Sequence, residues 1–407
     1  MKLWGIFKKI TTDEQTEKLN SSINALAFAG FIRGFSRFPL FLLLTLFFSQ
    51  RELLSYFDIG LIFMGYGFLS MPVGVYGGIL IDKMGRRRLM LITVFIILIS
   101  FTSMLFLVFF NESVIFIIIS FYGTGLAISM QRILNGAITS DVSNEKQRIA
   151  AFGRQRMLAN AGIGIGMIFA GIAYSYNILI FFTIPVLGAF VEFLVYLKYV
   201  PESANLGINR TRETTKMSKN RNLLKVSIVL AFSGLVSLMF LTPIFPIYFS
   251  NYDLLTPIEI SILFALNTVI VVLFQVPVNK LAHKIGEIKV IFVGLLLYAI
   301  SYLLFSVVTN FYMIGILVSI LSIGEDMILP MASSIISKMS NIENRGRYFG
   351  TYSMVSGFVL PFGPLIGTSL LQLFQNFPII IWITFMILGL VTSMAILSIK
   401  IEKKLTI

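Results

Sequence analysis

Long apolar runs recur along the whole chain and are separated by short polar segments. A helix of roughly 20 apolar residues crosses the ~30 Å hydrocarbon layer of a bilayer, where every backbone polar group must be paired internally. The alternating pattern of a membrane-barrel strand is absent, so the runs predict helices. Twelve membrane-spanning helices are expected, over residues 24–48, 57–81, 89–110, 114–138, 150–174, 179–197, 226–249, 257–281, 289–308, 311–337, 348–373 and 378–399.

The composition places the chain in a membrane rather than in water. Of its 407 residues, 57% are hydrophobic and only 13% are charged, and its mean hydropathy is +0.89. These values exclude an ordinary water-soluble domain. The chain has no cysteine, which excludes disulfides, thiolate catalysis and cysteine-ligated metals. We therefore expect an all-α membrane protein whose partner is the lipid bilayer.

Positive charge is distributed asymmetrically about the twelve spans. If the N-terminus is cytoplasmic, all but four of the 32 Lys and Arg residues lie in or next to cytoplasmic connections and termini. Of these four, Arg33, Arg37 and Arg132 lie inside spans, which leaves Arg51 on the outer side. This bias follows the positive-inside rule. We expect a multi-pass protein of the cell membrane with cytoplasmic termini, and we attribute the net charge of +13 to topology rather than to a nucleic-acid partner.

A cluster of charges between the second and third spans carries a family resemblance. It reads Gly78-x-x-x-Asp82-Lys83-x-Gly85-Arg86-Arg87. The spacing resembles the signature G-x-x-x-D-R-x-G-R-R of the major facilitator superfamily, with lysine in place of the first arginine. Lysine keeps the charge but lacks the planar fork that pairs bidentately. The resemblance implies two pseudo-symmetric six-helix bundles that rock about a central substrate site, and a cytoplasmic gate in which Asp82 lies near Tyr348.

Two sequence echoes indicate an internal duplication. With a shift of 201 residues, "NKLAHKIG" (279–286) falls under "GILIDKMG" (78–85), and Glu259 falls under Asp58. With a shift of 197 residues, "RGRYFG" (345–350) falls under "RIAAFG" (148–153). Such repeats are typical of transporter folds. We expect a cytoplasmic N-terminal segment (1–23), an N-terminal six-helix bundle (24–199), a cytoplasmic linker (200–225), a C-terminal six-helix bundle (226–399) and a cytoplasmic tail (400–407).

Ionisable residues inside the spans form the candidate substrate or proton cavity, because such groups are costly in lipid. Arg33 and Arg37 are four residues apart on one face of the first span, and Glu325 and Asp326 are adjacent in the tenth. The resemblance implies that the first, fourth, seventh and tenth spans line the central cavity. One of the two carboxylates would bind a proton, or would form a fixed pair with an arginine of the first or fourth span. For the two arginines, the alternatives are structural pairing and snorkelling.

Arg132, in "RILNG", is the fifth candidate for this cavity. It resembles the R-x-x-Q-G motif of the proton-driven branches of the superfamily, with Asn135 at the glutamine position. Glu192 is a single acid in the sixth span, for which a structural or lipid-edge role is at least as well supported as a functional one. Polar residues that we expect mainly to bond neighbouring helices are Asn160, Asn267 and Gln275.

Glycine motifs in the fifth and eleventh spans bear on the direction of transport. The stretch "NAGIGIGMIFAG" (160–171) resembles the antiporter motif of the export branches, with Met167 at the proline position. The stretch "GFVLPFGPLIG" (357–367) is a closer local match. Small residues permit close packing and proline bends a helix, so both motifs suit a gate, while ordinary helix packing is the alternative. The residues concerned are Gly162, Gly166, Gly171, Gly357, Gly363, Pro364 and Gly367.

The resemblance indicates a secondary active transporter rather than an enzyme or an ATP-driven pump. No G-x-x-x-x-G-K-[ST], H-E-x-x-H or G-x-S-x-G motif occurs, and the only histidine, His283, lies in a cytoplasmic turn. We expect no cofactor and no metal, and a proton gradient as the driving force. The 39 Phe and 18 Met residues suit the apolar walls of a cargo site, so we favour export of a hydrophobic or drug-like small molecule. We also expect a monomer. The alternatives are an uptake permease for a sugar, organic acid or peptide, and a non-transporting receptor on the same fold.

Overall fold

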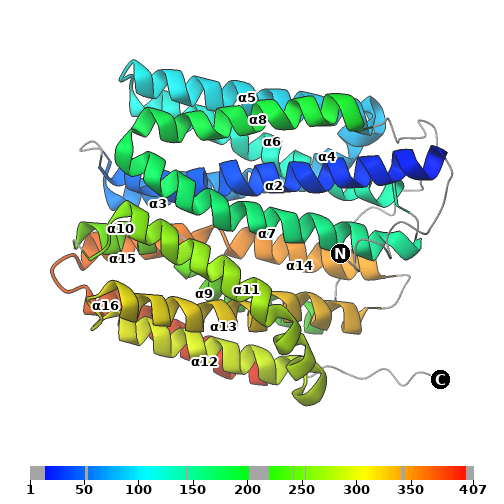
Figure 1. The fold of residues 1–407 in the computed structure, drawn as a ribbon. Helices are drawn as coiled ribbons and strands as arrows, with labels where there is room; N and C mark the ends of the chain where they lie inside the picture. Colours follow the sequence, from blue (N-terminus) through cyan, green and yellow to red (C-terminus); the bar gives the residue numbers. More distant parts are fainter. Residues whose placement is uncertain are drawn as a thin grey trace, which may run out of the picture.

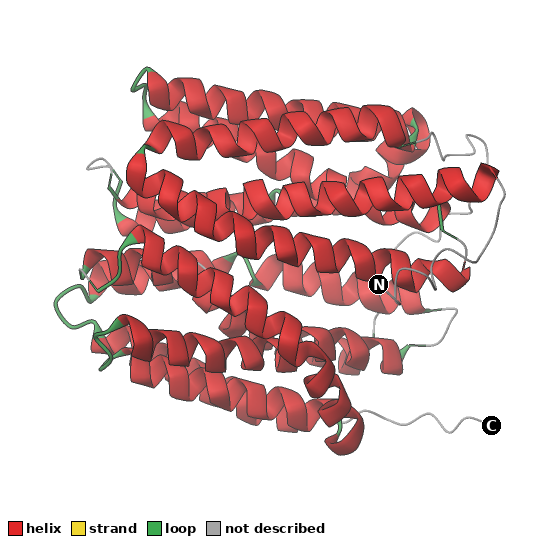
Figure 2. Cartoon of the chain, viewed as in Figure 1, coloured by secondary structure: helices red, strands yellow, loops and turns green. Residues whose placement is uncertain are grey.

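Helices make up the regular structure of the part of the chain that can be described (Figure 2). This part of the computed structural model comprises residues 14–50, 54–143, 145–200, 220–241, 243–252, 254–340 and 344–399. Within these ranges, twelve helical segments are long and apolar enough to cross a membrane. Eleven of them agree with the predicted spans to within five residues at each end, and the second, Tyr56–Val73, ends eight residues before the end of the predicted span 57–81. The all-α membrane architecture is confirmed. Most of the predicted linker, 200–225, lies outside the described residues.

The helices divide into an N-terminal and a C-terminal group that lie side by side (Figure 1). The first group comprises α2 (Glu14–Ser49), α3 (Tyr56–Phe68), α4 (Ser70–Met84), α5 (Arg86–Phe109), α6 (Val114–Asp141), α7 (Glu145–Tyr176) and α8 (Ile178–Tyr199). The second comprises α9 (Arg221–Leu241), α10 (Ile244–Asn251), α11 (Pro257–Ile285), α12 (Glu287–Phe305), α13 (Phe311–Met339), α14 (Arg345–Val359), α15 (Phe362–Leu373) and α16 (Ile379–Leu397). The most extensive contacts between the groups join α7 to α11 and α3 to α15.

Three of the spans are each broken into two helices. The breaks separate α3 from α4, α9 from α10, and α14 from α15. Pro243 immediately precedes α10 and Pro361 immediately precedes α15. The third break is followed by Pro72, in the first turn of α4. Proline has no backbone N–H and fits the start of a helix better than its interior, which explains the breaks. The predicted bend at the eleventh span therefore falls between α14 and α15.

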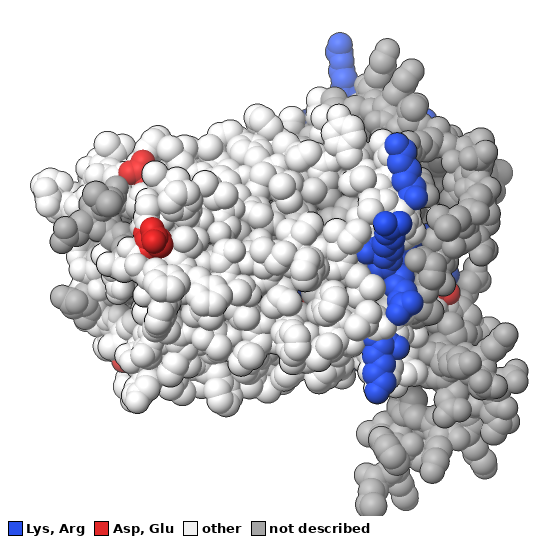
Figure 3. All heavy atoms as spheres, turned by 90° about the horizontal axis from the view of Figure 1, so that it is seen from above, with Lys and Arg blue, Asp and Glu red and all other residues white. Residues whose placement is uncertain are grey.

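The charges separate the two ends of the molecule. On the face drawn in Figure 3, Lys and Arg form a band near one end, acidic side chains stand at the opposite end, and the surface between them is almost free of charge. The helix ends explain this pattern, because α4, α11 and α13 carry Lys83, Lys284 and Lys338 in their last turns. The helices α3 and α11 begin with Asp58 and Glu259 in their first turns. We call these two ends the basic end and the acidic end.

The internal repeat is visible in the local geometry of the helix ends. Ser55 and Asp58 form a capping box at the start of α3, and Thr256 and Glu259 form the same box at the start of α11. A capping box pairs two backbone N–H groups that the first helical turn leaves free. Gly85 and Gly286 both have positive φ, 79° and 89°, where the chain turns into α5 and α12. Each pair is related by the shift of 201 residues, so the sequence echo corresponds to repeated structure.

The two groups touch near the acidic end and separate toward the basic end. A Cβ added to Gly171 of α7 would overlap the Ser261 side chain of α11, and the backbone N–H of Tyr56 donates to Gln372 Oε1 at 2.9 Å. Toward the basic end, a Cβ at Gly153 or Gly350 would meet no atom within 4 Å. Among the described residues, the two groups therefore make close contact near the acidic end, and Gly153 and Gly350 have free space beside them toward the basic end.

Candidate functional site

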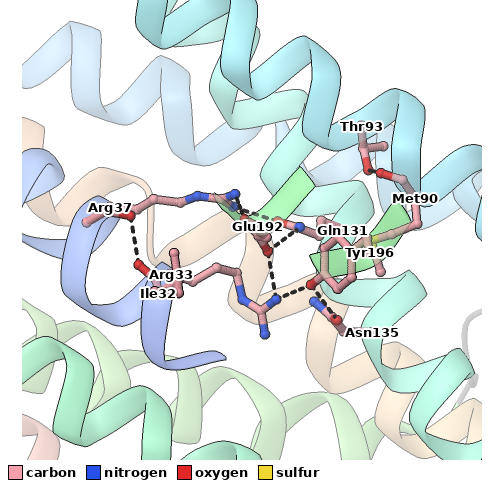
Figure 4. A network of polar contacts seen from close by, with 10 residues as sticks. Ile32, Arg33, Arg37, Met90, Thr93, Gln131, Asn135, Glu192 and Tyr196 are labelled. Atoms are coloured by element: carbon pink, nitrogen blue, oxygen red, sulfur yellow. Dashed lines mark hydrogen bonds and ion pairs between the residues drawn. The ribbon is translucent and has the colours of Figure 1, made fainter. Parts of the chain in front are cut away.

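A buried group of polar side chains joins three helices of the N-terminal bundle (Figure 4). The arginine pair lies on one face of α2 because its members are one helical turn apart. We call the group the Glu192 cluster; it consists of Arg33 and Arg37 of α2, Gln131 and Asn135 of α6, and Glu192 and Tyr196 of α8.

Glu192 is the centre of this cluster and binds both arginines. Arg33 Nη1 donates to Glu192 Oε1 at 2.9 Å, and Arg37 Nη2 pairs with Glu192 Oε2. Gln131 bridges the pair, since its Nε2 donates to Glu192 at 2.8 Å and its Oε1 accepts from Arg37 at 2.6 Å. The Tyr196 hydroxyl accepts from Arg33 and donates to Asn135 Oδ1 at 3.2 Å. Every carboxylate oxygen in the cluster therefore has a partner.

Because the Glu192 cluster is buried, it strongly constrains the relative positions of the three helices that carry it. The Glu192 side chain is fully buried, Arg37 is 7% exposed and Arg33 is 21% exposed. Buried charges are tolerated when they are paired and hydrogen-bonded, and removal of one partner leaves the other uncompensated. Two guanidinium groups face one carboxylate, so the cluster carries one excess positive charge. The arrangement is suited to fixing α2, α6 and α8 relative to one another.

The carboxylates of α13 have far fewer partners. Asn267 of α11 donates through Nδ2 to Glu325 Oε2 at 3.1 Å and to Ser322 Oγ at 2.9 Å. Asp326 is 2% exposed, and its Oδ2 has no hydrogen-bond partner among the described residues. Adjacent residues on a helix point about 100° apart, which places Asp326 in the packed interior while Glu325 stays partly exposed. Within the described chain, Arg33 and Arg37 pair with Glu192 and not with these two carboxylates.

A cleft of about 410 Å³ lies where α7 and α11 separate. Its walls are Phe152, Gly153, Arg156, Met157 and Asn160 of α7, and Val272 and Gln275 of α11. Arg156 is a charged residue of these walls. The cleft therefore has both polar and apolar walls, and Asn160 and Gln275, expected from sequence to bond neighbouring helices, are among the polar ones.

Arg132 stands apart from the Glu192 cluster. It follows Gln131 directly on α6, but its side chain is exposed, while Gln131 is 1% exposed. Arg132 interacts electrostatically with Tyr66 of α3. Asn135, the residue at the glutamine position of the predicted R-x-x-Q-G motif, bonds Tyr196 instead. The structure thus separates the two polar residues of that motif.

The predicted gate motif lies at the basic end, between α4 and α5. Gly85 has the positive φ that lets the chain turn between the two helices, a conformation that glycine adopts without strain. Arg86 pairs with Asp141 at the end of α6, and Arg87 Nη2 donates to the Leu197 carbonyl oxygen of α8 at 2.8 Å. Lys83 is exposed. The Asp82 side chain and the surroundings of Gly78 lie outside the described part of the chain, so the expected contact of Asp82 with the start of α14 stays a prediction.

The glycines of α7 make close helix contacts. A Cβ at Gly162 or Gly166 would overlap a backbone carbonyl oxygen of α2, that of Phe31 or Phe35. Gly171 faces Ser261 of the other bundle. The helices can approach this closely only where side chains are absent. Gly162 and Gly166 thus pack within the N-terminal bundle, and Gly171 packs between the bundles.

The glycines of the second motif flank the break between α14 and α15. A Cβ at Gly357, near the end of α14, would lie 3.9 Å from the Met71 side chain of α4, and Gly363 is buried at the start of α15. Gly367 packs against α10, since a Cβ there would lie 3.1 Å from the Ile244 Cβ. Pro364 lies in the first turn of α15, where a missing N–H costs least.

The sequence as a whole matches one protein family. A profile of the Major Facilitator Superfamily matches residues 26–255 and again residues 228–406. The chain belongs to the major facilitator superfamily. It is therefore a multi-pass membrane transporter, and the double match to one profile agrees with the internal repeat.

Members of the superfamily similar to this chain come from bacteria. "Quinolone resistance protein NorA" of Staphylococcus aureus is 25% identical over 345 residues, which cover 82% of this chain and 86% of the relative. "Uncharacterized MFS-type transporter YqjV" of Bacillus subtilis is 24% identical over 333 residues, which cover 77% of this chain and 78% of the relative.

Solved structures of the superfamily share the fold. A peptide transporter, POT, aligns with a TM-score of 0.77 at 14% identity, over 96% of this chain and 98% of its own. The nucleoside transporter NupG aligns with the same TM-score and identity, over 93% of this chain and 99% of its own. These alignments confirm the predicted major facilitator fold of two six-helix bundles.

Sequence reasoning missed the centre of the buried cluster. It gives Glu192 a structural or lipid-edge role without naming partners, and it does not single out Gln131 or Tyr196. A signal was present, because Glu192 is the only acid inside the predicted N-terminal spans apart from Asp58 at the edge of the second span. Two arginines buried on one helical face require a carboxylate, and Glu192 was the available one.

Proposed function

We propose that the protein is a secondary active transporter that exports hydrophobic or drug-like organic compounds in exchange for protons. The proposal also places the basic end in the cytoplasm, in keeping with the positive-inside rule. Transport would proceed by rocking of the two bundles, so that the cavity opens alternately at the basic and the acidic end. The basic end, toward which the cleft between α7 and α11 lies, would then be the side that loads cargo from the cell.

The observation that carries the proposal is the incompletely paired carboxylate pair on α13. Asp326 is buried with one oxygen that has no hydrogen-bond partner in the described structure, and Glu325 has one amide donor. A buried carboxylate without a fixed counterion is the kind of group that exchanges a proton. The relative NorA, named for quinolone resistance, supports cargo of the drug-like class.

A pH jump across vesicle membranes tests this function. Membrane vesicles with the basic end outward are loaded at acidic pH and diluted into alkaline buffer containing the fluorescent cation ethidium or the quinolone norfloxacin. We expect accumulation of the compound in the vesicles and release of protons from them. Asp326→Asn is expected to abolish gradient-driven accumulation, and the matched control Glu112→Gln, an exposed acid at the acidic end, is expected to leave it intact.

Two outcomes contradict the proposal in different ways. Accumulation that needs the opposite gradient supports the uptake alternative, because the same carboxylates would then carry protons together with cargo. Undiminished gradient dependence in Asp326→Asn, Glu325→Gln and the double variant removes α13 from the coupling site. Absence of movement for a broad panel of labelled solutes favours the receptor alternative.

A further inference from the structure

The start of α5 and the end of α8 meet at the basic end of the N-terminal bundle. Arg87 Nη2, in the first turn of α5, donates to the Leu197 carbonyl oxygen, in the last turn of α8, at 2.8 Å. This bond brings the next residues along the chain, Arg88 and Lys198, to the same level of two neighbouring helices. Both side chains are exposed, and Lys198 Nζ lies 5.2 Å from the centre of the Tyr199 ring. Two cations therefore lie near each other beside an aromatic ring.

Farther from the basic end, the same two helix faces are apolar. Phe95 follows Arg88 by two helical turns and therefore lies on the same face of α5. Its ring packs against that of Phe193 of α8, with the centroids 6.2 Å apart. Leu194 precedes Lys198 by one turn on the same face of α8. Phe95 and Leu194 are 51% and 45% exposed, as expected of side chains that contact lipid.

The two cations lie on the side of the molecule where charged and uncharged surface meet. Figure 3 shows the molecule from above the view of Figure 1, in which α5 and α8 lie uppermost, and its band of Lys and Arg borders a surface almost free of charge. In a bilayer the uncharged surface contacts the acyl chains, so the band lies at the level of the phosphates. Clusters of Lys and Arg at this level attract anionic lipid headgroups.

The C-terminal bundle has the equivalent helix pair with a different charge. With the shift of 201 residues, α12 and α16 correspond to α5 and α8, and the run Arg-Arg-Arg (86–88) corresponds to Glu-Ile-Lys (287–289). Ile399 stands at the position equivalent to Lys198 and is 5% exposed. Both helix pairs meet at the basic end, so the positive-inside rule alone does not explain the difference between them. The difference indicates an anionic partner for the N-terminal pair.

We propose that Arg88 and Lys198 bind the phosphate of an anionic phospholipid, such as phosphatidylglycerol, from the leaflet at the basic end. The guanidinium group pairs with two phosphate oxygens, and the ammonium group adds a second positive charge. A zwitterionic lipid binds less tightly, because its own cation is repelled by the same two groups. One acyl chain lies along Phe95, Phe193 and Leu194. The bound lipid contacts both helices and stabilises their junction.

Native mass spectrometry of the full-length protein in detergent measures this binding. The probes are palmitoyl-oleoyl phosphatidylglycerol and the phosphatidylcholine with the same chains, and we expect the wild-type protein to prefer the first. Arg88→Gln combined with Lys198→Gln should weaken phosphatidylglycerol binding by roughly 25-fold, about fivefold for each charge, and leave phosphatidylcholine binding unchanged. Arg88→Lys combined with Lys198→Arg keeps both charges and should keep most of the binding. The matched control is Lys289→Gln, at the exposed position equivalent to Arg88, which should change nothing.

Four results overturn the proposal. They are equal affinity of the wild-type protein for the two lipids, undiminished phosphatidylglycerol binding in the double glutamine variant, an equal loss in Lys289→Gln, and displacement of the lipid by an equal concentration of inorganic phosphate. The last result would assign the two cations to a free anion.

A fluorescence measurement in vesicles locates the lipid. Leu194→Trp adds a reporter on the proposed path of the acyl chain, and the signal of the two native tryptophans is subtracted with the wild-type protein. Phosphatidylglycerol with brominated acyl chains should quench the reporter more strongly than brominated phosphatidylcholine at the same mole fraction. Addition of the two glutamine substitutions should remove this preference. A preference that persists in their presence would mean that other residues select the lipid, and would overturn the assignment.

Discussion

Buried carboxylates have several partners in the N-terminal bundle and few in the C-terminal bundle. In the N-terminal bundle, Glu192 is fully buried and bonded to Arg33, Arg37 and Gln131. In the C-terminal bundle, Asp326 is just as inaccessible but keeps an oxygen with no hydrogen-bond partner in the described structure, and Glu325 is bonded only weakly by comparison, to one amide.

This difference separates a structural role from a reactive one. A carboxylate held by two guanidinium groups has little reason to take up a proton, because its charge is already compensated. A carboxylate with an incomplete shell gains more from a proton or a cation. Both sites consist of ionisable groups inside predicted spans, so the number of partners, rather than burial alone, distinguishes them.

Removal of the central carboxylate should produce the largest loss of stability. Glu192→Gln would leave Arg33 and Arg37 buried without a counterion, and breaking such a pair typically costs about 3–5 kcal/mol. We expect a marked fall in the midpoint of thermal unfolding in detergent, together with poor yield of folded protein.

A combined replacement and an exposed control sharpen this result. In the triple variant Arg33→Met, Arg37→Met and Glu192→Leu, all three charges disappear, so we expect stability to recover relative to Glu192→Gln. Glu112→Gln, at an exposed position, should change the free energy of unfolding by less than about 0.5 kcal/mol. A Glu192→Gln protein as stable as the wild type would show that the cluster is not a structural constraint.

Replacement of Asp326 should affect function and spare the fold. Asp326→Asn removes a buried charge that has an unbonded oxygen, so the free energy of unfolding should stay within about 1 kcal/mol of the wild-type value or rise. Proton-driven transport should be lost, as measured in the vesicle assay. Strong destabilisation with retained coupling would reverse the assignment of the two sites.

The membrane spans could be predicted from sequence because lipid imposes a simple requirement on composition. Each span needs a long apolar stretch, and eleven of the twelve predicted stretches agree with the spans of the structure to within five residues. Ser55 with Asp58 and Thr256 with Glu259 also marked two helix starts, through a local capping pattern. The break at Leu69 between α3 and α4 was not predicted, although Pro72 lies in the first turn of α4, where a missing N–H costs least.

The sites were harder to predict because packing decides which helices meet. The shared face of Arg33 and Arg37 is a local property, whereas the contact of Arg37 with Glu192 joins residues 155 positions apart. The resemblance implied a central cavity for the arginines, and their contacts are instead with α6 and α8 of their own bundle. Glu325 and Asp326 could be singled out because ionisable groups inside a membrane span cost free energy. Which of the two is more buried depends on how α13 packs.

Replacement of Gln131, in the Glu192 cluster, should reduce stability more than replacement of Asn267, beside the α13 carboxylates. Gln131 bonds both Arg37 and Glu192, so Gln131→Leu leaves two buried charged groups short of a partner and should cost about 1–3 kcal/mol. Asn267 bonds Ser322 and the partly exposed Glu325, so Asn267→Leu should cost less. Asn267→Leu should instead shift the pH dependence of transport, whereas Gln131→Leu should not. Thermal unfolding and a transport pH profile measure the two effects, and equal stability losses would contradict the comparison.

The smallest changes in stability are expected on removal of the ion pairs at the basic end, where the two bundles differ. Arg86 of α5 pairs with Asp141 of α6, and Glu287 of α12 pairs with Lys338 of α13. The first members of these pairs are related by the shift of 201 residues and the second by the shift of 197, so equivalent positions carry opposite charges. Each pair joins two neighbouring helices within its own bundle.

Lys338→Gln should cost only about 0.2–1 kcal/mol, because Lys338 is 56% exposed and exposed ion pairs are weak and screened by salt. Asp141→Asn should cost more, since Arg86 and Asp141 are 19% and 25% exposed. Thermal unfolding at low and at high salt checks both, and the deficit of Lys338→Gln should vanish at high salt. Exchange of the charges in Arg86→Glu with Asp141→Lys should restore most of the stability that Asp141→Asn loses. Two results together would contradict this ranking: no recovery of stability in the charge exchange, and a loss of stability in Lys338→Gln as large as in Gln131→Leu. The paired charges at the basic end would then contribute more to the stability of the fold than the buried Glu192 cluster.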